Sequence, residues 1–299
     1  MPIVTCAALA LALANPASHG TYQLAEDCGP VTGFFGGTPR AALQVPVVFQ
    51  RPLVVEAGDH KVHGLIVDKG GNLTWRGGQI VAPAGSQAGL RGKPVYGVLL
   101  ANASKVTLEK LHLTNARKAI VVNDSSDITL RDARCNGDVE DCMIASGARR
   151  IRFLNNEIGP FQLVATRCLR GAVLSLGEGR RQCEAGGGQW TDGWHADVLQ
   201  LRNGVEDVLA EGNRINTTGQ GLTQMEAVGD LPIRAVVFRN NVIASGRHGL
   251  TLGACFACRI EGNRLTTAVP GWKSQIRPGQ ALACGNQVPD GGPGRDKCR

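Results

Sequence analysis

The chain has 299 residues, with 40 glycines, 43% apolar, 19% charged and only 4% aromatic residues. The apolar share is enough for a core, and there are too few charges for a disordered chain. No apolar run approaches the roughly 20 residues of a membrane helix, and the glycines lack a period of three. We therefore expect neither a helical bundle, nor a membrane-spanning protein, nor a collagen-like fibre.

The balance of 32 basic and 25 acidic residues gives a net charge of +7. Such an excess fits either solubility alone or a polyanionic partner, which can be an acidic polysaccharide or a nucleic acid. Dense Lys/Arg runs with interleaved aromatic residues, zinc-finger spacings and basic helices are all missing from the sequence. We therefore expect no nucleic-acid partner.

The N-terminus carries an apolar stretch, AALALALA at 7–14, which ends in an A-x-A site at 12–14. This pattern predicts a signal peptide over residues 1–20, and hence a secreted or periplasmic protein, although no Lys or Arg precedes the stretch. The alternative is a short apolar strand or cap at the start of the fold.

Ten cysteines are many for a reduced cytosolic protein and favour an oxidising compartment. Nine would remain after loss of Cys6 with a signal peptide, and their pairing does not follow from sequence. Local candidates are Cys168 with Cys183, and Cys284 with Cys298. The C-x-x-C at 255–258 has no second pair at metal-binding spacing.

Short segments of alternating apolar residues recur along the chain, which is the period of a β-strand. Five share one pattern, with an asparagine at the corner of four of them: ITLRDARC (128–135), IRFLNNEI (151–158), VLAEGNRI (208–215), VVFRNNVI (236–243) and CRIEGNRL (258–265). The spacing between neighbouring copies is mostly 22 to 28 residues, and a second short strand precedes each copy.

Such a repeat without helical segments predicts a solenoid wound from strands, in which stacking buries the inward side chains. An antiparallel sandwich is the alternative, but its strands would not repeat so regularly. We assign the stacked residues Asn156, Asn213, Asn241 and Asn263 a structural role at a sharp bend. The predicted division is an N-terminal cap at 21–58, a β-helix at 59–270 with an insertion at 159–194, and a C-terminal cap at 271–299.

The coil pattern resembles the right-handed parallel β-helix proteins of the pectate-lyase-like superfamily over about residues 60–270. The resemblance implies an all-β, right-handed parallel β-helix in a single domain, but it does not imply one reaction, since lyases, hydrolases, epimerases, tailspikes and adhesins share this fold. The N-T-D, D-D and G-H-G elements of polygalacturonases and the R-x-P-x-x-R element of pectate lyases are not intact here.

The densest polar cluster is the H-x-D-x-x-Q element formed by His195, Asp197 and Gln200, which Trp194 precedes and Arg202 follows. It resembles an element of uncharacterised bacterial β-helix proteins. Strict alternation would put Asp197 and Gln200 on opposite faces of a strand, so a kink is needed to bring all these groups outside.

Alignment of the coils adds neighbours to this cluster. Asp141 falls in the column of Asp197, followed by Gln220 and His248, and Arg247 and Glu226 lie nearby. We assign His195, Asp197, Asp141 and His248 as candidate catalytic residues. The candidate substrate-binding residues are Gln200, Arg202, Arg247, Glu226 and Trp194.

Three chemistries can use these groups. A lyase of uronate polysaccharides needs a base such as His195 and positive charge from arginine or from Ca²⁺ held by Asp141 and Asp197. An inverting hydrolase needs two separated carboxylates, and a non-catalytic binder needs only tryptophans and hydrogen-bonding groups. We expect a monomeric lyase acting on an acidic polysaccharide, with an inverting hydrolase, an epimerase and a binder as alternatives.

Overall fold

The computed structural model describes residues 1–29, 41–82, 96–114, 116, 118–137, 139, 141–160, 182–188, 197–224, 230–246, 248–268 and 274–288. It describes the backbone alone at 34–35, 38–39, 161, 167–170, 173–176, 180–181 and 189–191. All structural statements below refer to these residues.

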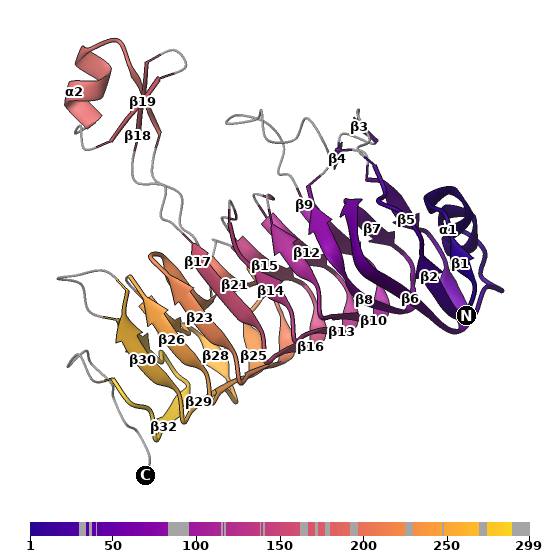
Figure 1. Ribbon diagram of the computed structural model, residues 1–299. Coiled ribbons are helices and arrows are strands. Elements are labelled where there is room, and N and C mark those ends of the chain that lie inside the picture. Colours follow the sequence, from indigo (N-terminus) through magenta and orange to yellow (C-terminus); the bar gives the residue numbers. More distant parts are fainter. Residues whose placement is uncertain are drawn as a thin grey trace.

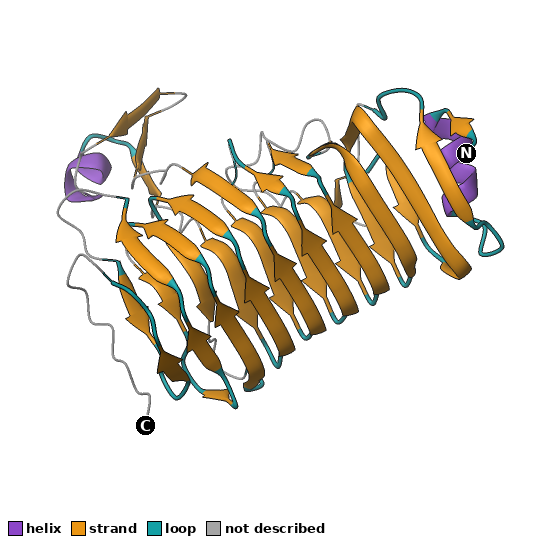
Figure 2. Ribbon diagram, turned by 60° about the horizontal axis from the view of Figure 1, so that its bottom comes forward, coloured by secondary structure: helices purple, strands orange, loops and turns teal. Residues whose placement is uncertain are grey.

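The chain winds into a right-handed parallel β-helix, so the predicted fold is confirmed (Figures 1 and 2). One sheet, here called the groove sheet, has the spatial order β31-β27-β24-β21-β15-β12-β9-β7-β5. Its strands are β5 (Leu43–Val45), β7 (Leu65–Asp68), β9 (Tyr96–Ala101), β12 (Lys118–Asn123), β15 (Asp141–Ser146), β21 (Asp197–Arg202), β24 (Gln220–Gln224), β27 (His248–Thr251) and β31 (Gln275–Arg277).

The other strands of the coils form a second and a third face, which the long strands β6 (Val48–His63) and β8 (Gly71–Val81) join. The second face continues through β10 (Ser104–Glu109), β13 (Ser126–Arg131), β16 (Arg149–Leu154), β22 (Glu206–Glu211), β25 (Ile233–Arg239), β28 (Cys255–Phe256), β29 (Arg259–Glu261) and β32 (Leu282–Cys284). The third face holds β11 (His112–Thr114), β14 (Arg134–Cys135), β17 (Glu157–Phe161), β23 (Arg214–Thr217), β26 (Val242–Ser245) and β30 (Arg264–Thr267).

The corners between faces are made by residues in the left-handed region of backbone conformation, stacked coil upon coil. One such column follows the groove sheet and holds Lys69, Asn102, Asp124, Gly147 and Asn203, with φ between 46° and 62°. Asn, Asp and Gly enter this region at the lowest cost, which explains why these residue types punctuate the repeats. At Gly147 a side chain would also meet the Asp124 carboxylate, which would have to move to make room for it.

The predicted asparagine column is confirmed as a hydrogen-bonded ladder on the inside of one corner. From Asn213 onward, each amide oxygen accepts the backbone N–H and the side-chain amide of the asparagine one coil earlier, with distances of 2.8–3.0 Å. The ladder runs from Asn156 through Asn213, Asn241 and Asn263 to Asn286, and the first four side chains are at most 1% exposed. The amides therefore satisfy backbone groups that the bend leaves without strand partners.

Charged side chains form a second kind of ladder on the outside of the second face. Glu56, Arg76, Glu109 and Arg131 pair in register on successive coils, and Glu109 contacts both arginines. Further along, Arg150 pairs with Asp127, Arg152 with Asp207, and Arg239 with Glu211. Much of the arginine content is thus taken up by stacking of the coils.

The N-terminal segment forms a helix and two strands at one end of the solenoid (Figure 1), while the predicted signal peptide at 1–20 and cap at 21–58 stay predictions. Helix α1 (Cys6–Leu13) buries Leu9 and Leu13 completely in the core, and Thr5 caps its first turn. β1 (Ile3–Val4) pairs with β2 (Gly20–Leu24), which pairs in parallel with β6.

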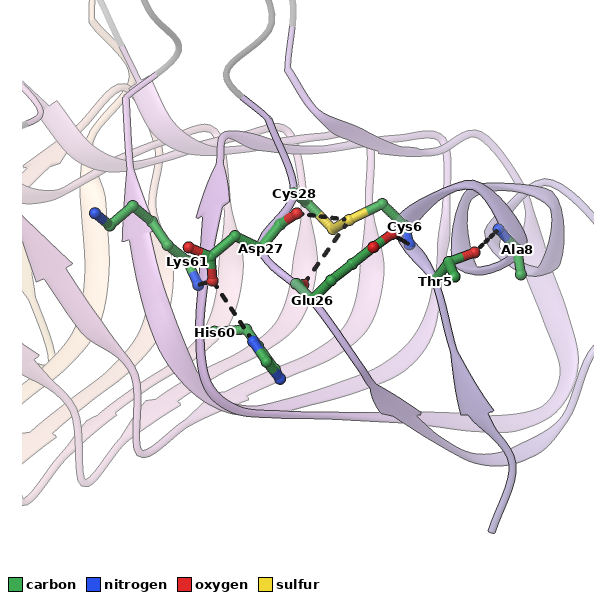
Figure 3. Close-up of a disulfide and its surroundings, with 8 residues drawn as sticks. All are labelled: Thr5, Cys6, Ala8, Glu26, Asp27, Cys28, His60 and Lys61. Atoms are coloured by element: carbon green, nitrogen blue, oxygen red, sulfur yellow. Dashed lines mark hydrogen bonds and ion pairs between the residues drawn. A yellow bond between two sulfur atoms is a disulfide. The ribbon is translucent and has the colours of Figure 1, made fainter.

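A disulfide joins Cys6, which a signal-peptide cleavage would remove, to Cys28 (Figure 3). Around it, the Glu26 carboxylate accepts the Cys6 N–H, and the Asp27 carboxylate accepts the Lys61 N–H of β6. These contacts tie the cap to the first full coil. The apolar residues of α1 thus cover the end of the solenoid core.

The remaining segments complete both ends and the insertion. Parallel pairing continues through β31 and β32, so the β-helix extends past the predicted limit at residue 270. Within the insertion, β18 (Arg167–Arg170), β19 (Val173–Leu176) and β20 (Gln189–Thr191) form an antiparallel sheet beside α2 (Arg180–Ala185). The short strands β3 (Phe34–Phe35) and β4 (Thr38–Pro39) form a hairpin.

The described cysteines divide into bridged and free ones. Cys255 is bonded to Cys258, and Cys183 and Cys284 are also in disulfides, whereas Cys135 and Cys142 are free and buried. Burial raises the pKa of the Cys135 thiol well above its usual range. The predicted pairings of Cys183 and Cys284 involve Cys168 and Cys298, whose side chains lie outside the described residues.

Candidate functional site

Every central strand of the groove sheet departs from strict alternation in the same way. In β12 both Ala119 and Ile120 are completely buried, and in β21 both Val198 and Leu199 are. The residue that precedes each buried pair therefore shares the outer face with the residue that follows it. A hydrogen bond of 2.9 Å from Gln200 Nε2 to Asp197 Oδ2 shows that these two side chains share the outer face, whereas His195 lies outside the described residues.

The first residues of successive strands form a polar row across the groove sheet. The pairing puts Tyr96 beside Lys118, Lys118 beside Asp141, Asp141 beside Asp197, and Asp197 beside Gln220. The offset between β24 and β27 continues the row to His248. The predicted column of Asp141, Asp197, Gln220 and His248 is therefore correct, because it follows from the pairing register alone.

The centre of this row is a buried network. Asp141 and Asp197 are 3% and 0% exposed. The Lys118 ammonium lies 3.3 Å from Asp141 Oδ2, and the Asp197 N–H donates to Asp141 Oδ1 at 3.2 Å. Asp141 thus holds the Lys118 side chain at the groove and anchors the start of β21.

A groove of about 390 Å³ crosses this sheet diagonally, from the start of β9 and β12 to the end of β21. Its floor contains Val121 and Ile144, which are 5% and 7% exposed although they point outward. Polar groups line its two ends: Tyr96 and Lys118 at the first, and Asn123, Ser146, Arg202, Asn203 and Asp230 at the second. An apolar floor with polar ends suits a sugar chain, whose rings have apolar faces and polar edges.

Sequence reasoning found Arg202 but missed Tyr96 and Lys118. The sequence does indicate them, because the segments at 96–102 and 118–124 align with 141–147 on their inward apolar residues. Extending the alignment of Asp141 by two coils toward the N-terminus places Lys118 and Tyr96 in the same column. Burial raises the pKa of Tyr96, so its hydroxyl keeps its proton at neutral pH.

Four other predicted site residues are described by the structure but do not line the groove: Asp141, Asp197, Gln200 and His248. His248 is partly exposed in the polar row, and Gln200 donates to Asp197. The remaining four, His195, Trp194, Glu226 and Arg247, lie outside the described residues.

The predicted Ca²⁺ ligands Asp141 and Asp197 are already engaged by other groups. Both Asp141 oxygens face donors, one of them the Lys118 ammonium, and one Asp197 oxygen accepts from Gln200. A calcium ion needs six to eight oxygen ligands, and an ammonium ion in contact with one of them opposes its binding. Within the described ranges, no group of three or more His, Cys, Asp or Glu residues can hold a metal ion.

No family model matches the chain, and no curated protein does either. Several solved structures share its fold, and three of them are described here. The alginate lyase from Paenibacillus sp. str. FPU-7 has a TM-score of 0.56 at 15% identity, covering 97% of this chain and 95% of that one.

The surface adhesin PfbA of Streptococcus pneumoniae has a TM-score of 0.58 at 10% identity, covering 89% of this chain and 67% of that one. The Dettilon tailspike protein has a TM-score of 0.59 at 10% identity, covering 98% and 57%. At such identities the similarity concerns the fold, and the parallel β-helix architecture expected from the coil pattern is what these comparisons establish. No described helix is long and apolar enough to cross a membrane.

Proposed function

We propose that the protein is a polysaccharide lyase that cleaves a uronate-containing polymer by β-elimination. The observation that carries the proposal is the groove, in which a lysine, a tyrosine and an arginine flank an apolar floor on the outer face of the solenoid. Cations are what a polymer with a carboxylate on each sugar requires. The alginate lyase among the solved structures of similar fold agrees with this choice of chemistry.

In β-elimination a base removes the C5 proton of the uronate next to the scissile bond. The C5–H electrons form the C4=C5 double bond, the C4–O4 bond breaks, and the departing O4 takes up a proton. The Lys118 ammonium stabilises the charge that develops on the carboxylate during this step. The Tyr96 hydroxyl, which keeps its proton, serves as the donor to O4. His195, two residues before Asp197, is the proposed base, as its position in the sequence predicts.

The alternative of an inverting hydrolase with Asp141 and Asp197 has less support. Its two carboxyl groups need a separation of about 6.5–9.5 Å, with a water molecule between substrate and base. Here the two aspartates are direct neighbours in register on adjacent strands, and Asp141 is committed to Lys118. Their arrangement suits positioning of Lys118 better than activation of water.

We place the protein outside the cytoplasm, because the disulfides Cys6–Cys28 and Cys255–Cys258 persist only under oxidising conditions. Ca²⁺ dependence stays a prediction from the sequence, and the proposal of Lys118 as the cation implies turnover without it. A chelator separates these two versions of the mechanism.

The test is ultraviolet absorbance during incubation with a panel of uronate polysaccharides, with Ca²⁺ and with chelator. A lyase raises the absorbance through the new C=C bond. Tyr96→Phe and Lys118→Met should each lower kcat at least about 100-fold, as expected for loss of a proton donor or of a charge contact in the transition state. The matched controls Tyr22→Phe and Lys105→Met, outside the groove, should retain turnover. A flat trace on every uronate polymer, with new reducing ends, would establish a hydrolase instead.

A further inference from the structure

Arg202 has no ion pair with a carboxylate among the residues that the structure describes. Six arginines of the second face, by contrast, pair with acidic residues on their own or a neighbouring coil: Arg76, Arg131, Arg150, Arg152, Arg239 and Arg259. Arg202 instead lines the groove and is only partly exposed. A guanidinium that lines a groove and has no ion-pair partner among the described residues is a ready receptor for a carboxylate from outside.

The position of Arg202 relative to Lys118 decides which carboxylate it can meet. Arg202 is the last residue of β21 and Lys118 the first of β12, and β15 lies between the two strands. Ser146 of β15 pairs in register with Arg202 of β21 and with Asn123 of β12, so Arg202 lies at the level of the last residue of β12. Two strand spacings across the sheet and five residues along it separate the backbones by roughly 15–20 Å. The Lys118 ammonium is held at Asp141, at the start of β15, and Arg202 stands at the end of β21, so we assign the two cations to different sugars.

The floor between the two cations is shaped for the sugars in between. Val121 and Ile144 lie next to each other in register and give an apolar strip in the middle of the groove. No charged residue lines this middle part among the described residues, whereas both ends carry cations. The groove thus offers carboxylate contacts at its ends and ring contacts between them.

We infer that Arg202 forms a distal subsite that binds a uronate carboxylate several sugars away from the scissile bond. This inference rests on the proposed function and adds that the enzyme recognises an interior stretch of a long polyuronate. Arg202 therefore selects substrates by length, and Lys118 acts at the reacting sugar. Asp230, which lines the same end, tempers this attraction by its negative charge.

The experiment compares Arg202→Gln with the unmodified protein on polyuronate chains of graded length. For long polymers the variant should bind about five- to tenfold more weakly, as expected for a lost charge-assisted contact in a partly exposed groove. For oligomers too short to reach from Lys118 to Arg202, the affinity should not change. Asp230→Asn should strengthen binding of long chains, and Arg234→Gln, on the second face, should leave binding at every length unchanged.

Binding is measured by affinity electrophoresis in polyuronate gels, with a neutral polysaccharide as reference, so no turnover is required. A weaker affinity of Arg202→Gln for all lengths alike would place Arg202 at the reacting sugar and overturn the inference. An unchanged affinity for long chains would overturn it as well. Length-dependent binding through Arg202 without any unsaturated product would refute the lyase and keep the subsite.

Discussion

The asparagine ladder gives the sharpest prediction about stability, because one side chain serves several buried groups. Asn213 accepts the Asn156 backbone N–H at 2.9 Å and donates to the Phe153 carbonyl at 2.9 Å. Asn213→Ala leaves both backbone groups buried without a partner. At about 1–3 kcal/mol for each, the free energy of unfolding should fall by about 2–6 kcal/mol.

The matched control is Asn286→Ala, at the last rung of the same ladder. Asn286 makes the same kinds of contact with Asn263 and Ile260, but it is only half-buried, so water can replace the lost bonds. Its loss should cost about 1 kcal/mol or less. The assay is urea unfolding followed by circular dichroism. Equal losses at both positions would refute the argument that burial of the ladder sets its contribution.

Three further predictions follow from other parts of the structure. Leu9→Ala in α1 should cost about 2–5 kcal/mol in urea unfolding, whereas Leu11→Ala on the exposed side should cost less than about 0.5, and equal effects would contradict a capping role for the helix. Burial opposes ionisation of Glu109, but Arg131 and Arg76 outweigh it and lower its pKa, so this carboxylate contributes stability that is present above pH 5 or so and is lost as the pH falls below about 4. Thermal unfolding across pH 2–7 should show this loss, and Glu109→Gln should flatten the acid limb. The buried thiols Cys135 and Cys142 should react with iodoacetamide only in denaturant, and labelling of the native protein, seen by mass spectrometry, would contradict their burial.

The repeating parts of the molecule can be predicted from the sequence because each coil has the same pattern of inward apolar residues as the next. Asn213 and Asn241 mark the same corner, and Asp141 and Asp197 share a column, since the inward apolar residues set a common register. The kink before Leu199 does not follow from an alternating pattern, because it depends on how two adjacent buried residues pack. That is why the network of Gln200 and Asp197 emerges only from the structure.

The N-terminus shows a different reason for a limit of sequence reasoning. A signal peptide and a capping helix both need an apolar run, so AALALALA fits either. The structure adds the burial of Leu9 and Leu13, at i and i+4, in the core and the disulfide partner of Cys6. Both are tertiary features that a local pattern does not predict, and the signal peptide stays a prediction.

The disulfides of the described solenoid are distributed in a way that bears on how the molecule unravels. An inner coil has a neighbour on each side, but an outermost coil has only one, so fraying begins at the ends and travels inward. The bridges Cys6–Cys28 and Cys255–Cys258 sit in the first and the late coils, and Cys284 is bridged beyond them, while Cys135 and Cys142 in the middle remain thiols. Reduction of these disulfides should therefore promote unfolding from the two ends of the solenoid. The central coils, which carry the groove, should unfold last.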